Sequence, residues 1–391
     1  MAVQPATPVR SAAMPALVAL DLPGGPGFVD ALRRVWERGD AAFPIDRRLP
    51  PAARAQVLRA LAPGRVVDEH GDEHRVEGGR PVDPGDALVV PTSGTTGAPK
   101  GVVLTHEAVR ASALATSARL AVDPARDRWL ACLPLAHVGG LSVVTRALVT
   151  GTPLTVHDGF DAGAVEQAAR AGCTLVSLVA TALQRIDPDR FRVVVVGGGR
   201  PPAGLPAHCV TTYGMTETGS GVVYDGVPLD GVELRCADDS EVWLRGPMLL
   251  RAYRDGTDPK DAAGWLATGD LGAIDPSGRL VVHGRRGDVV VTGGEKVWPD
   301  PVEAVLRTVP GVRDVAVIGR PDPDWGQVVV AVVEPDGDPP ALDALRTAVK
   351  AVLPPWCAPR ALEVVASLPR TALGKVRRAD LAARSGPADR G

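Results

Sequence analysis

TSGTTGAPKG, residues 92–101, is the stretch of this sequence that decides the fold. It follows a predicted strand at residues 87–90 and precedes a predicted helix that begins near His106. Its glycines permit tight turns, and its hydroxyl, backbone N–H and ammonium groups suit a polyphosphate. Gly101 follows Lys100, where a Walker A loop has Ser or Thr. The alternative is a plain surface turn. The candidate phosphate ligands are Thr92, Ser93, Gly94, Thr95, Thr96 and Lys100.

Beyond this loop, short apolar runs alternate with helical patterns. We predict strands at residues 129–133, 153–157, 174–179 and 192–196, and helices at residues 107–120, 140–149, 162–171 and 181–186. Continuous apolar strands that alternate with helices indicate a parallel sheet covered on both faces. Before the loop, we predict proline-rich loops and one helix, residues 27–38.

The pattern changes after residue 231, where short alternating strands such as 241–245 and 280–283 predict a small β-rich subdomain. Beyond residue 284, strands and helices alternate again and predict a separate α+β domain. The predicted fold is therefore α/β. A large N-terminal domain, residues 1–285, has parallel or mixed sheets flanked by helices plus the β-rich subdomain, and a small mobile α+β domain comprises residues 286–391.

Composition excludes several classes of protein. The net charge of -3 gives no footprint of nucleic-acid binding. The apolar run at residues 16–22 is interrupted, and no apolar run reaches about 18 residues, so we expect neither a signal peptide nor a membrane span. The five cysteines are dispersed and form no CxxC pair, which disfavours a zinc site and favours the cytoplasm.

YGMTE, residues 213–217, follows a predicted strand at residues 209–212. Glu217 offers the hard oxygen that Mg²⁺ prefers. Thr216 can donate to a phosphate and Tyr213 can stack on adenine, with Gly214 between them. Taken alone, the segment also fits a turn with a solvated glutamate.

Two further motifs suit a nucleoside. Gly197, Gly198 and Gly199 follow four consecutive valines, as a loop beside adenine or as a tight turn. Asp270 ends the run TGD, and its two oxygens can accept from both ribose hydroxyls, although Asp is also common in β-turns.

The C-terminal third carries three more motifs. GRRGD, residues 284–288, contains Arg285, and GGEK follows with Gly293, Gly294 and Glu295. PRTALGK ends at Lys375, a cation available where charge builds up on a phosphate. Each motif alone also fits a hairpin turn or an ordinary loop.

Together and in this order, the motifs resemble the adenylate-forming superfamily of acyl-CoA ligases, luciferases and peptide-synthetase adenylation domains. The resemblance implies ATP, Mg²⁺ and coenzyme A as ligands. It implies that Lys375, Thr216, Glu217 and His137 are catalytic, that Arg285 contacts ribose or phosphate, and that Gly293, Gly294 and Glu295 line the path of coenzyme A. Gly287 departs from the family's hinge pattern, where Asp, Lys or Ser is common two residues after the arginine.

The acid substrate is suggested by LPLAHVGGLSVVTR, residues 133–146. His137 begins an apolar helix and Arg146 lies inside it, where an arginine needs a partner. A second substrate carboxylate would serve; a core salt bridge for Arg146 and a capped core histidine are the alternatives. This segment and residues 177–185 most resemble the family branch that acts on o-succinylbenzoate in menaquinone biosynthesis.

Two other functions remain open at this stage. The chain could be another aryl- or acyl-CoA ligase, or a non-catalytic nucleotide-binding homologue. Retention of Lys100, Glu217, Asp270, Arg285 and Lys375 disfavours the second. The expected partners are a small carboxylic acid, ATP and coenzyme A, with a homodimer as the oligomeric state to test.

Overall fold

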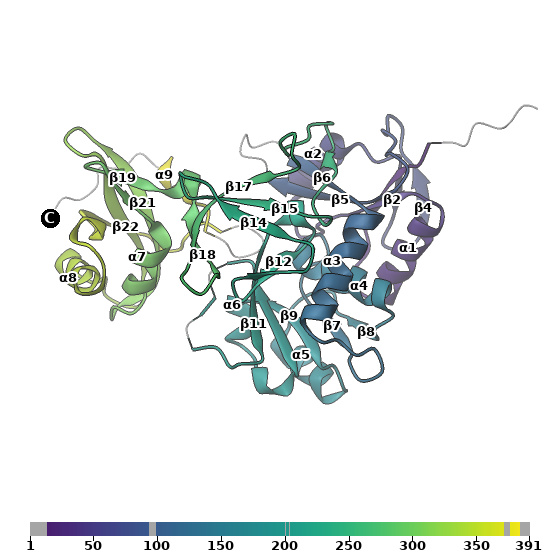
Figure 1. Ribbon diagram of the computed structural model, residues 1–391, viewed down its shortest axis with the longest axis horizontal. Coiled ribbons are helices and arrows are strands. Elements are labelled where there is room, and N and C mark those ends of the chain that lie inside the picture. Colours follow the sequence, from purple (N-terminus) through teal and green to yellow (C-terminus); the bar gives the residue numbers. More distant parts are fainter. Residues whose placement is uncertain (1–13, 94–98, 200, 203, 371–375, 384–391) are drawn as a thin grey trace, which may run out of the picture. The chain divides into compact units, whose positions relative to one another are not determined.

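The computed structural model describes residues 14–93, 99–199, 201–202, 204–370 and 376–383 (Figure 1). Its contacts divide the chain into two units. The first comprises Met1–Val232 with Gly246–Pro259, and the second comprises Glu233–Arg245 with Lys260–Gly391. The predicted division at residue 285 would assign Glu233–Arg245 to the N-terminal domain, and it stays a prediction.

The first unit contains a mixed sheet in the order β16-β6-β5-β2-β1-β3-β4. Its central pairs β3/β1, β1/β2 and β2/β5 are parallel, and the outer pairs are antiparallel. The strands are β1 Leu17–Leu20, β2 Ala41–Pro44, β3 Arg65–Val67, β4 Glu73–Arg75, β5 Asp86–Ser93, β6 Pro99–Thr105 and β16 Ala252–Tyr253.

Four of these strands and two helices precede β5, where the sequence predicted only loops and one helix. That prediction was wrong because β1 to β4 are only three or four residues long, too short for an alternating pattern to stand out between prolines and glycines. β1 nevertheless lies inside the sheet between β2 and β3, and all four of its side chains are fully buried. The helices are α1 Pro26–Glu37 and α2 Pro51–Leu61.

A second sheet has the order β13-β12-β11-β10-β9-β7-β8. The five neighbouring strands β8, β7, β9, β10 and β11 run parallel, as predicted. β12 and β13 extend one edge with antiparallel pairing. The strands are β7 Trp129–Ala131, β8 Leu154–Val156, β9 Leu175–Val179, β10 Val193–Gly197, β11 Cys209–Gly214, β12 Gly221–Tyr224 and β13 Val227–Pro228.

Two helices fill the space between these sheets (Figure 1). α3 His106–Arg119 packs on β5 and β6, α4 Val138–Thr150 packs on β7 and β9, and the helices contact each other. Both begin within two residues of their predicted starts, because runs of 14 and 13 residues without proline are too long for a buried strand. The remaining helical elements of this unit are α5 Ala162–Arg170, α6 Ala180–Leu183, η1 Pro188–Arg190 and η2 Thr216–Thr218.

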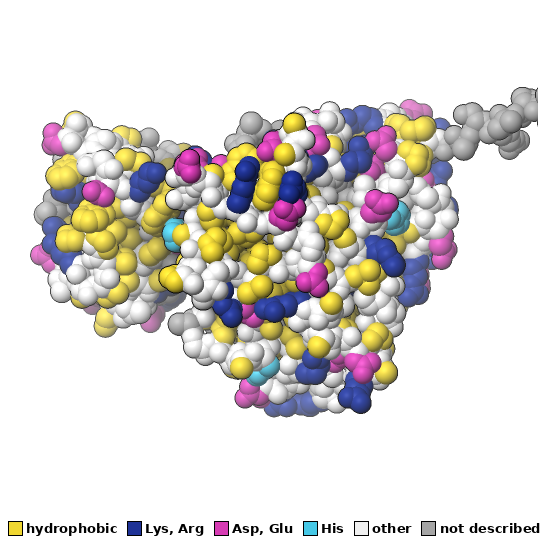
Figure 2. Space-filling view, viewed as in Figure 1, with side chains coloured by type: hydrophobic (Ala, Val, Ile, Leu, Met, Phe, Trp, Pro, Cys, Tyr) yellow, Lys and Arg dark blue, Asp and Glu magenta, His cyan; other side chains and the backbone are white. Residues whose placement is uncertain are grey.

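The second unit begins with an antiparallel sheet in the order β14-β15-β17-β18. Its strands are β14 Glu233–Cys236, β15 Glu241–Arg245, β17 Leu266–Ile274 and β18 Leu280–Arg285. The Arg235 guanidinium stacks between the rings of Trp243 and Trp265, 5.2 and 4.4 Å from their centroids. Figure 2 shows basic and apolar side chains that alternate on the surface over this region. The stacked side chains cover one face of the sheet.

A five-stranded sheet completes the second unit, with the order β20-β19-β22-β21 and β23 beside β22. Buried valines on β21 and β22, such as Val315 and Val330, pack with the helices into its core. The elements are η3 Arg286–Asp288, β19 Val290–Thr292, β20 Glu295–Val297, α7 Pro299–Leu306, β21 Val312–Asp322, β22 Gly326–Pro335, α8 Leu342–Val352, η4 Pro355–Cys357, β23 Ala361–Val364 and α9 Arg378–Ala382.

The described ranges contain no helix suited to span a membrane and no disulfide bond. Among their helices, none has both the length and the apolar character that a bilayer crossing demands. All five cysteines lie in these ranges as free thiols, and four of them are buried. Burial raises the pKa of Cys132 to about 12.

Candidate active site

Several predicted residues meet at one edge of the second sheet. β7, β9, β10 and β11 are parallel neighbours, so their carboxyl ends lie together. His137 follows β7, Gly197–Gly199 begin at the end of β10, and Gly214 ends β11. Ligands of open α/β sheets bind outside the carboxyl ends of the strands. This edge is therefore the candidate nucleotide and acid site.

Close contacts with neighbouring strands explain two of the glycines at this edge, with a side-chain hydroxyl for Gly197 and with backbone for Gly214. A Cβ on Gly197 would lie 2.7 Å from Thr212 Oγ1, and a Cβ on Gly214 would lie 2.2 Å from the Ser220 carbonyl oxygen. No real Cβ tolerates such contacts. The backbone at the end of both strands is therefore bare, which suits a flat ring such as adenine.

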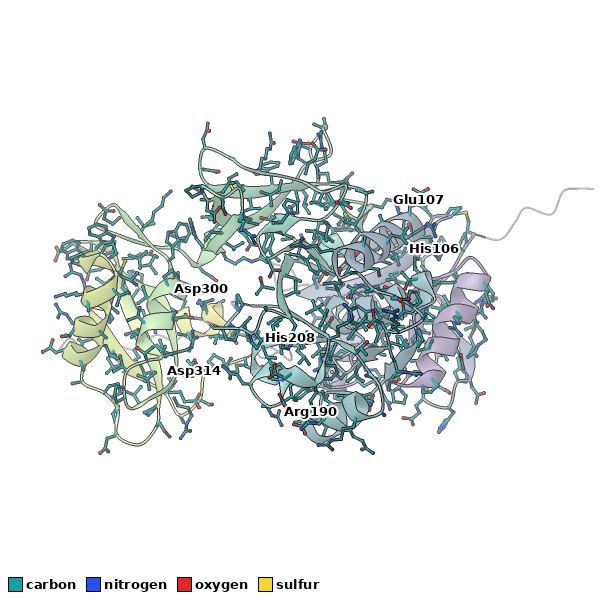
Figure 3. All side chains as sticks on the ribbon, turned by 60° about the horizontal axis from the view of Figure 1, so that its bottom comes forward. His106, Glu107, Arg190, His208, Asp300 and Asp314 are labelled. Carbon is teal, nitrogen blue, oxygen red and sulfur yellow. The ribbon has the colours of Figure 1, made fainter. Side chains whose placement is uncertain are left out.

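The phosphate loop joins two antiparallel strands. Thr92 on β5 lies directly opposite Lys100 on β6, so a hydroxyl and an ammonium group flank the base of the loop. The sequence predicted a helix directly after the loop; β6 intervenes, and α3 begins at His106, which Figure 3 labels beside Glu107. Gly94, Thr95 and Thr96 lie outside the described residues, as does the Ser93 side chain.

Tyr253 links the two charged groups of the phosphate site. Its hydroxyl donates to Glu217 Oε1 at 3.0 Å, and the Lys100 ammonium lies 5.0 Å from the centroid of its ring. Burial and the nearby Glu217 carboxylate raise the pKa of Tyr253, so the phenol stays protonated and donates. One side chain thus holds a carboxylate at its hydroxyl and a cation at its ring face.

The sequence analysis missed Tyr253 because it sits on β16, a strand of two residues. Arg251 fixes this strand through Nε and Nη2, which each donate to the buried Asp86 carboxylate at 2.8 Å. The Arg254 backbone N–H donates to the Gly101 carbonyl at 2.7 Å. The available signal was composition: the chain has only three tyrosines.

Glu217 projects from η2, a single 3₁₀ turn held by Thr218. The Thr218 hydroxyl accepts from the Met215 N–H at 2.9 Å and donates to the Ser220 carbonyl at 2.6 Å. The Leu250 N–H donates to the Glu217 carbonyl at 2.7 Å. These bonds fix the backbone that carries the carboxylate, with Thr216 one residue before it.

The residues present fit a Mg²⁺ ion that is carried in with a nucleotide. Within the described ranges, no group of three or more His, Cys, Asp or Glu side chains could hold a metal by itself. Mg²⁺ commonly takes one or two carboxylates and completes its shell with phosphate oxygens and water. The single half-buried carboxylate of Glu217 beside Lys100 matches that pattern.

The second unit contributes an ion pair at its ribose candidate. Asp270 and Arg285 lie opposite each other on β17 and β18. Arg285 Nε lies 2.7 Å from Asp270 Oδ1, and Asp270 is 6% exposed. The structure therefore brings together two residues that the sequence predicted separately. The Thr268 hydroxyl accepts from the Asp270 N–H at 3.1 Å and steadies the turn.

Gly293 and Gly294 form the two-residue turn between β19 and β20, with φ of +57° and +84°. Positive φ at both positions is typical of a type I′ hairpin. A Cβ on Gly293 would lie 2.6 Å from the Trp325 ring. A pocket of about 530 Å³ lies beside this hairpin, lined by Gly294, Glu295, Lys296, Trp298, Pro301, Val302, Leu353, Pro354, Trp356 and Cys357.

His137 has a partner that the sequence did not reveal. Its Nε2 lies 3.2 Å from Oδ2 of the buried Asp46, which also accepts two bonds from the Arg48 guanidinium at 2.8 Å. Burial would raise the pKa of Asp46, but the bonds from Arg48 and His137 outweigh it and hold that pKa well below its usual range.

Arg146 does not lie with His137. It is nine residues farther along α4, about 13 Å along the helix axis at 1.5 Å per residue. The guanidinium is buried between α3 and α4, over the Trp129 ring at 4.9 Å. Direct contact between Arg146 and the substrate stays a prediction.

Lys375 lies outside the described residues, but the segment after it has a firm attachment. Arg378 on α9 bonds Asp288 at 3.2 Å, Asp300 at 2.8 Å and Glu303 at 2.7 Å. Asp300, labelled in Figure 3, lies in the first turn of α7. The chain is thus anchored three residues beyond Lys375.

Comparison with known families follows the two parts of the sequence. Residues 67–297 match the family model described as AMP-binding enzyme, and residues 301–375 match its C-terminal domain. The chain belongs to the AMP-binding enzyme family. The resemblance inferred from the motifs is confirmed.

Relatives of this AMP-binding enzyme share one name. A probable 2-succinylbenzoate–CoA ligase of Mycobacterium tuberculosis is 43% identical, over 95% of this chain and 99% of its own. The 2-succinylbenzoate–CoA ligase of Listeria monocytogenes is 34% identical, over 76% and 70%.

Solved structures confirm the predicted α/β fold with its large N-terminal and small C-terminal domains. The o-succinylbenzoate CoA synthetase of Bacillus subtilis, in complex with its acyl-adenylate intermediate, has a TM-score of 0.84 and 28% identity, over 95% of this chain and 89% of that one. The same synthetase with ATP and a magnesium ion has a TM-score of 0.82 and 27% identity, over 93% and 89%.

Proposed function

We propose that this AMP-binding enzyme joins o-succinylbenzoate to coenzyme A at the expense of ATP. An oxygen of the acid attacks the α-phosphorus, and pyrophosphate leaves. The coenzyme A thiol then attacks the acyl carbon, and AMP leaves. The observation that carries the proposal is a 43% identical relative of that name, matched over nearly its whole length, together with the Lys100–Tyr253–Glu217 cluster.

For the first half-reaction, we assign nucleotide binding to the residues at the carboxyl edge and to the pair in the second unit. Lys100 and Thr92 bind phosphate, and Thr216 donates to it. Bound Mg²⁺, held by Glu217, would neutralise phosphate charge. Gly197–Gly199, Tyr213 and Gly214 surround adenine, and Asp270 and Arg285 contact the ribose. Ser93, Gly94, Thr95, Thr96 and Lys375 complete the proposed set from the sequence.

For the acid, we assign His137 as the contact at the start of α4. Asp46 and its bonds with Arg48 hold the ring in place. A histidine with one ring nitrogen held by a carboxylate presents the other nitrogen in a fixed direction. This arrangement supports a positional role for the Asp46–His137 pair.

For the second half-reaction, we assign coenzyme A to the β19–β20 hairpin with Gly293, Gly294 and Glu295. The neighbouring pocket supports this proposal: its volume of about 530 Å³ lies in the usual range for ligand sites, and Trp356 in its wall is 45% exposed. An exposed tryptophan beside a pocket offers a flat apolar face to a ligand.

The pathway, the compartment and the oligomeric state belong to the same proposal. The product would serve menaquinone biosynthesis. The free cysteines fit a reducing compartment such as the cytoplasm. A homodimer is the state that light scattering would test.

The deciding experiment is a panel of acids with ATP, Mg²⁺ and coenzyme A. It compares o-succinylbenzoate with benzoate, succinate and 4-phenylbutyrate, and it follows pyrophosphate release and thioester mass in parallel. We expect the highest kcat/KM with o-succinylbenzoate. A higher value with another acid would make the protein a different acyl-CoA ligase. Nucleotide binding without acid-dependent pyrophosphate release would make it a non-catalytic homologue.

A further inference from the structure

Arg146 is a buried cation inside the first unit. It is 2% exposed, and within the described part of the chain its Nε and Nη1 atoms have no hydrogen-bond partner. Burial lowers the pKa of its guanidinium. Nε1 of Trp129, on the neighbouring β7 strand, is also buried without a partner. All of these nitrogen atoms are donors and cannot accept, so the region has an excess of buried donors.

Charge makes this excess significant. An arginine side chain stays protonated in proteins, and a charge taken out of water without a counter-charge is strongly destabilising. The Trp129 ring under the guanidinium compensates in part, as does the negative end of α4, because Arg146 lies in its last turns. Neither supplies a full negative charge. The titratable side chain that interacts electrostatically with Arg146 is Tyr224, whose phenol raises the pKa of the guanidinium against the effect of burial.

A small cavity between α3 and α4 is lined in part by Arg146. Its free volume is about 10 Å³, and its wall combines Arg146 with Ser112, Ser142 and apolar side chains such as Leu104 and Leu141. A volume of this size holds one water-sized occupant. The Ser112 hydroxyl lies 3.0 Å from that of Ser220, so the polar side of the wall continues beyond the cavity.

We propose that this cavity is an anion site in which Arg146 binds one chloride ion. A chloride is somewhat larger than a water molecule, accepts hydrogen bonds from N–H and O–H groups, and supplies the missing charge. The ion would join α3 to α4, and through them the two sheets of the unit. The carboxylate of a bound acid has the same chemistry. Both the cavity volume and the separation between Arg146 and His137 favour the free ion.

The first test measures thermal unfolding of the full chain in sodium chloride, sodium bromide and sodium gluconate at equal ionic strength. We expect either halide to raise Tm saturably, by about 2–4 °C over gluconate. Arg146→Met keeps most of the side-chain volume and should lose this rise. Arg110→Met removes an exposed arginine from the neighbouring helix α3 and should retain the rise. An equal halide response in Arg146→Met would overturn the proposal.

The second test begins with the unmodified protein, so its crystallographic result does not depend on a variant folding. Crystals of the unmodified protein soaked in bromide should show an anomalous peak within hydrogen-bond distance of Arg146 Nε or Nη1. A water molecule there without anomalous signal would overturn the site. Stabilisation by o-succinylbenzoate in halide-free buffer, absent in Arg146→Met and without any halide response, would instead assign the anion to the substrate. Neither test requires catalysis, so a failure of the proposed function leaves both informative.

Discussion

At the scale of single residues, the proposed phosphate site contains a tyrosine that carries no charge at neutral pH. Tyr253 gives its hydroxyl to Glu217 and its ring face to Lys100. A carboxylate and an ammonium group placed in direct contact would satisfy each other. With the phenol between them, each keeps its capacity for an incoming ligand. If the proposed assignment is correct, these side chains are already in position when phosphate binds.

Replacing Tyr253 with Phe separates these two contacts. The variant keeps the ring under Lys100 and removes the donor to Glu217. We expect acid-dependent pyrophosphate release to fall about 10-fold, since a hydrogen bond to a charged group contributes about 1.5–3 kcal/mol. The Mg²⁺ concentration needed for half-maximal pyrophosphate release should rise at the same time. Pyrophosphate release measured across a range of Mg²⁺ concentrations checks both effects.

Tyr224→Phe is the matched control. The Tyr224 hydroxyl donates to Thr116 at 3.3 Å within the core. We expect its loss to reduce the free energy of unfolding by about 1 kcal/mol and to leave the Mg²⁺ dependence unchanged. Equal Mg²⁺ curves for both variants and the unmodified protein would show that Tyr253 does not organise Glu217.

Asp46 predicts a pH-dependent stability. Its pKa is lower in the folded protein, so its contribution is fully present above the unfolded value of about 4 and is lost as pH falls toward the folded value. We expect Asp46→Asn to reduce the free energy of unfolding by about 2 kcal/mol at pH 7, from its bonds to Arg48 and His137. The deficit should shrink below pH 4.

Urea unfolding at several pH values measures this difference. Asp30→Asn, an exposed position on α1, removes the same charge and should change stability little at any pH. A deficit for Asp46→Asn that stays constant down to pH 3 would exclude the linkage.

The candidate site was predictable where residues occur in continuous motifs. Lys100, Glu217, Asp270 and Arg285 were found in this way, and the structure pairs the last two. Tyr253 and Asp46 were missed because their partners lie 36 and 91 residues away in the chain. No local sequence pattern predicts such a hydrogen bond. It forms only when folding brings distant segments into contact.

At the scale of elements, the β19–β20 hairpin is the clearest case of a local conformation enforced by glycine. Gly293 combines positive φ with close approach to Trp325. We expect Gly293→Ala to shift this hairpin and to lower the rate of thioester formation several-fold, while acid-dependent pyrophosphate release changes little. Stopped-flow measurement of the two half-reactions distinguishes them.

Gly337→Ala controls for backbone strain alone. Gly337 also has positive φ, +87°, in the same unit, but a Cβ there would meet nothing within 4 Å. Both variants should lose a similar amount of stability from strain, about 1 kcal/mol. If Gly337→Ala slowed thioester formation as much as Gly293→Ala, the hairpin would have no specific role.

Helices and strands were predicted correctly where the run of residues was long or continuously apolar. α3, α4 and the valine-rich β10 match their predicted positions closely. β1 to β4 were missed because three or four residues between turns look the same in a strand and in a loop. β6, of seven residues, was missed because its first residues were assigned to the glycine-rich loop. Their pairing is decided by long-range contacts such as β1 with β2 and β3.

At the scale of the whole molecule, the proposed nucleotide ligands are divided between two units. Lys100, Tyr253 and Glu217 belong to the first unit, and Asp270 and Arg285 belong to the second. The sequence analysis placed Lys100, Glu217, Asp270 and Arg285 together in the predicted N-terminal domain, residues 1–285. It had no means of showing that β14 and β15 are grouped with the C-terminal residues. The mobility of the C-terminal domain stays a prediction.

Two half-reactions in one chain predict separable defects. Lys375→Ala should abolish formation of the acyl-adenylate, because the cation is needed as charge builds up at the α-phosphate. It should largely spare thioester formation from chemically supplied adenylate. Lys350→Ala, an exposed lysine on α8, is the control and should affect neither. Equal loss of both half-reactions in Lys375→Ala would contradict the proposed role.

The state of the thiols has a consequence for fidelity. An acyl-adenylate acylates any thiolate that reaches it, and only the ionised sulfur is a good nucleophile. Burial raises the pKa of Cys132, Cys209, Cys236 and Cys357, so these four thiols stay protonated at neutral pH. We therefore expect these four side chains to escape acylation while the intermediate waits for its acceptor.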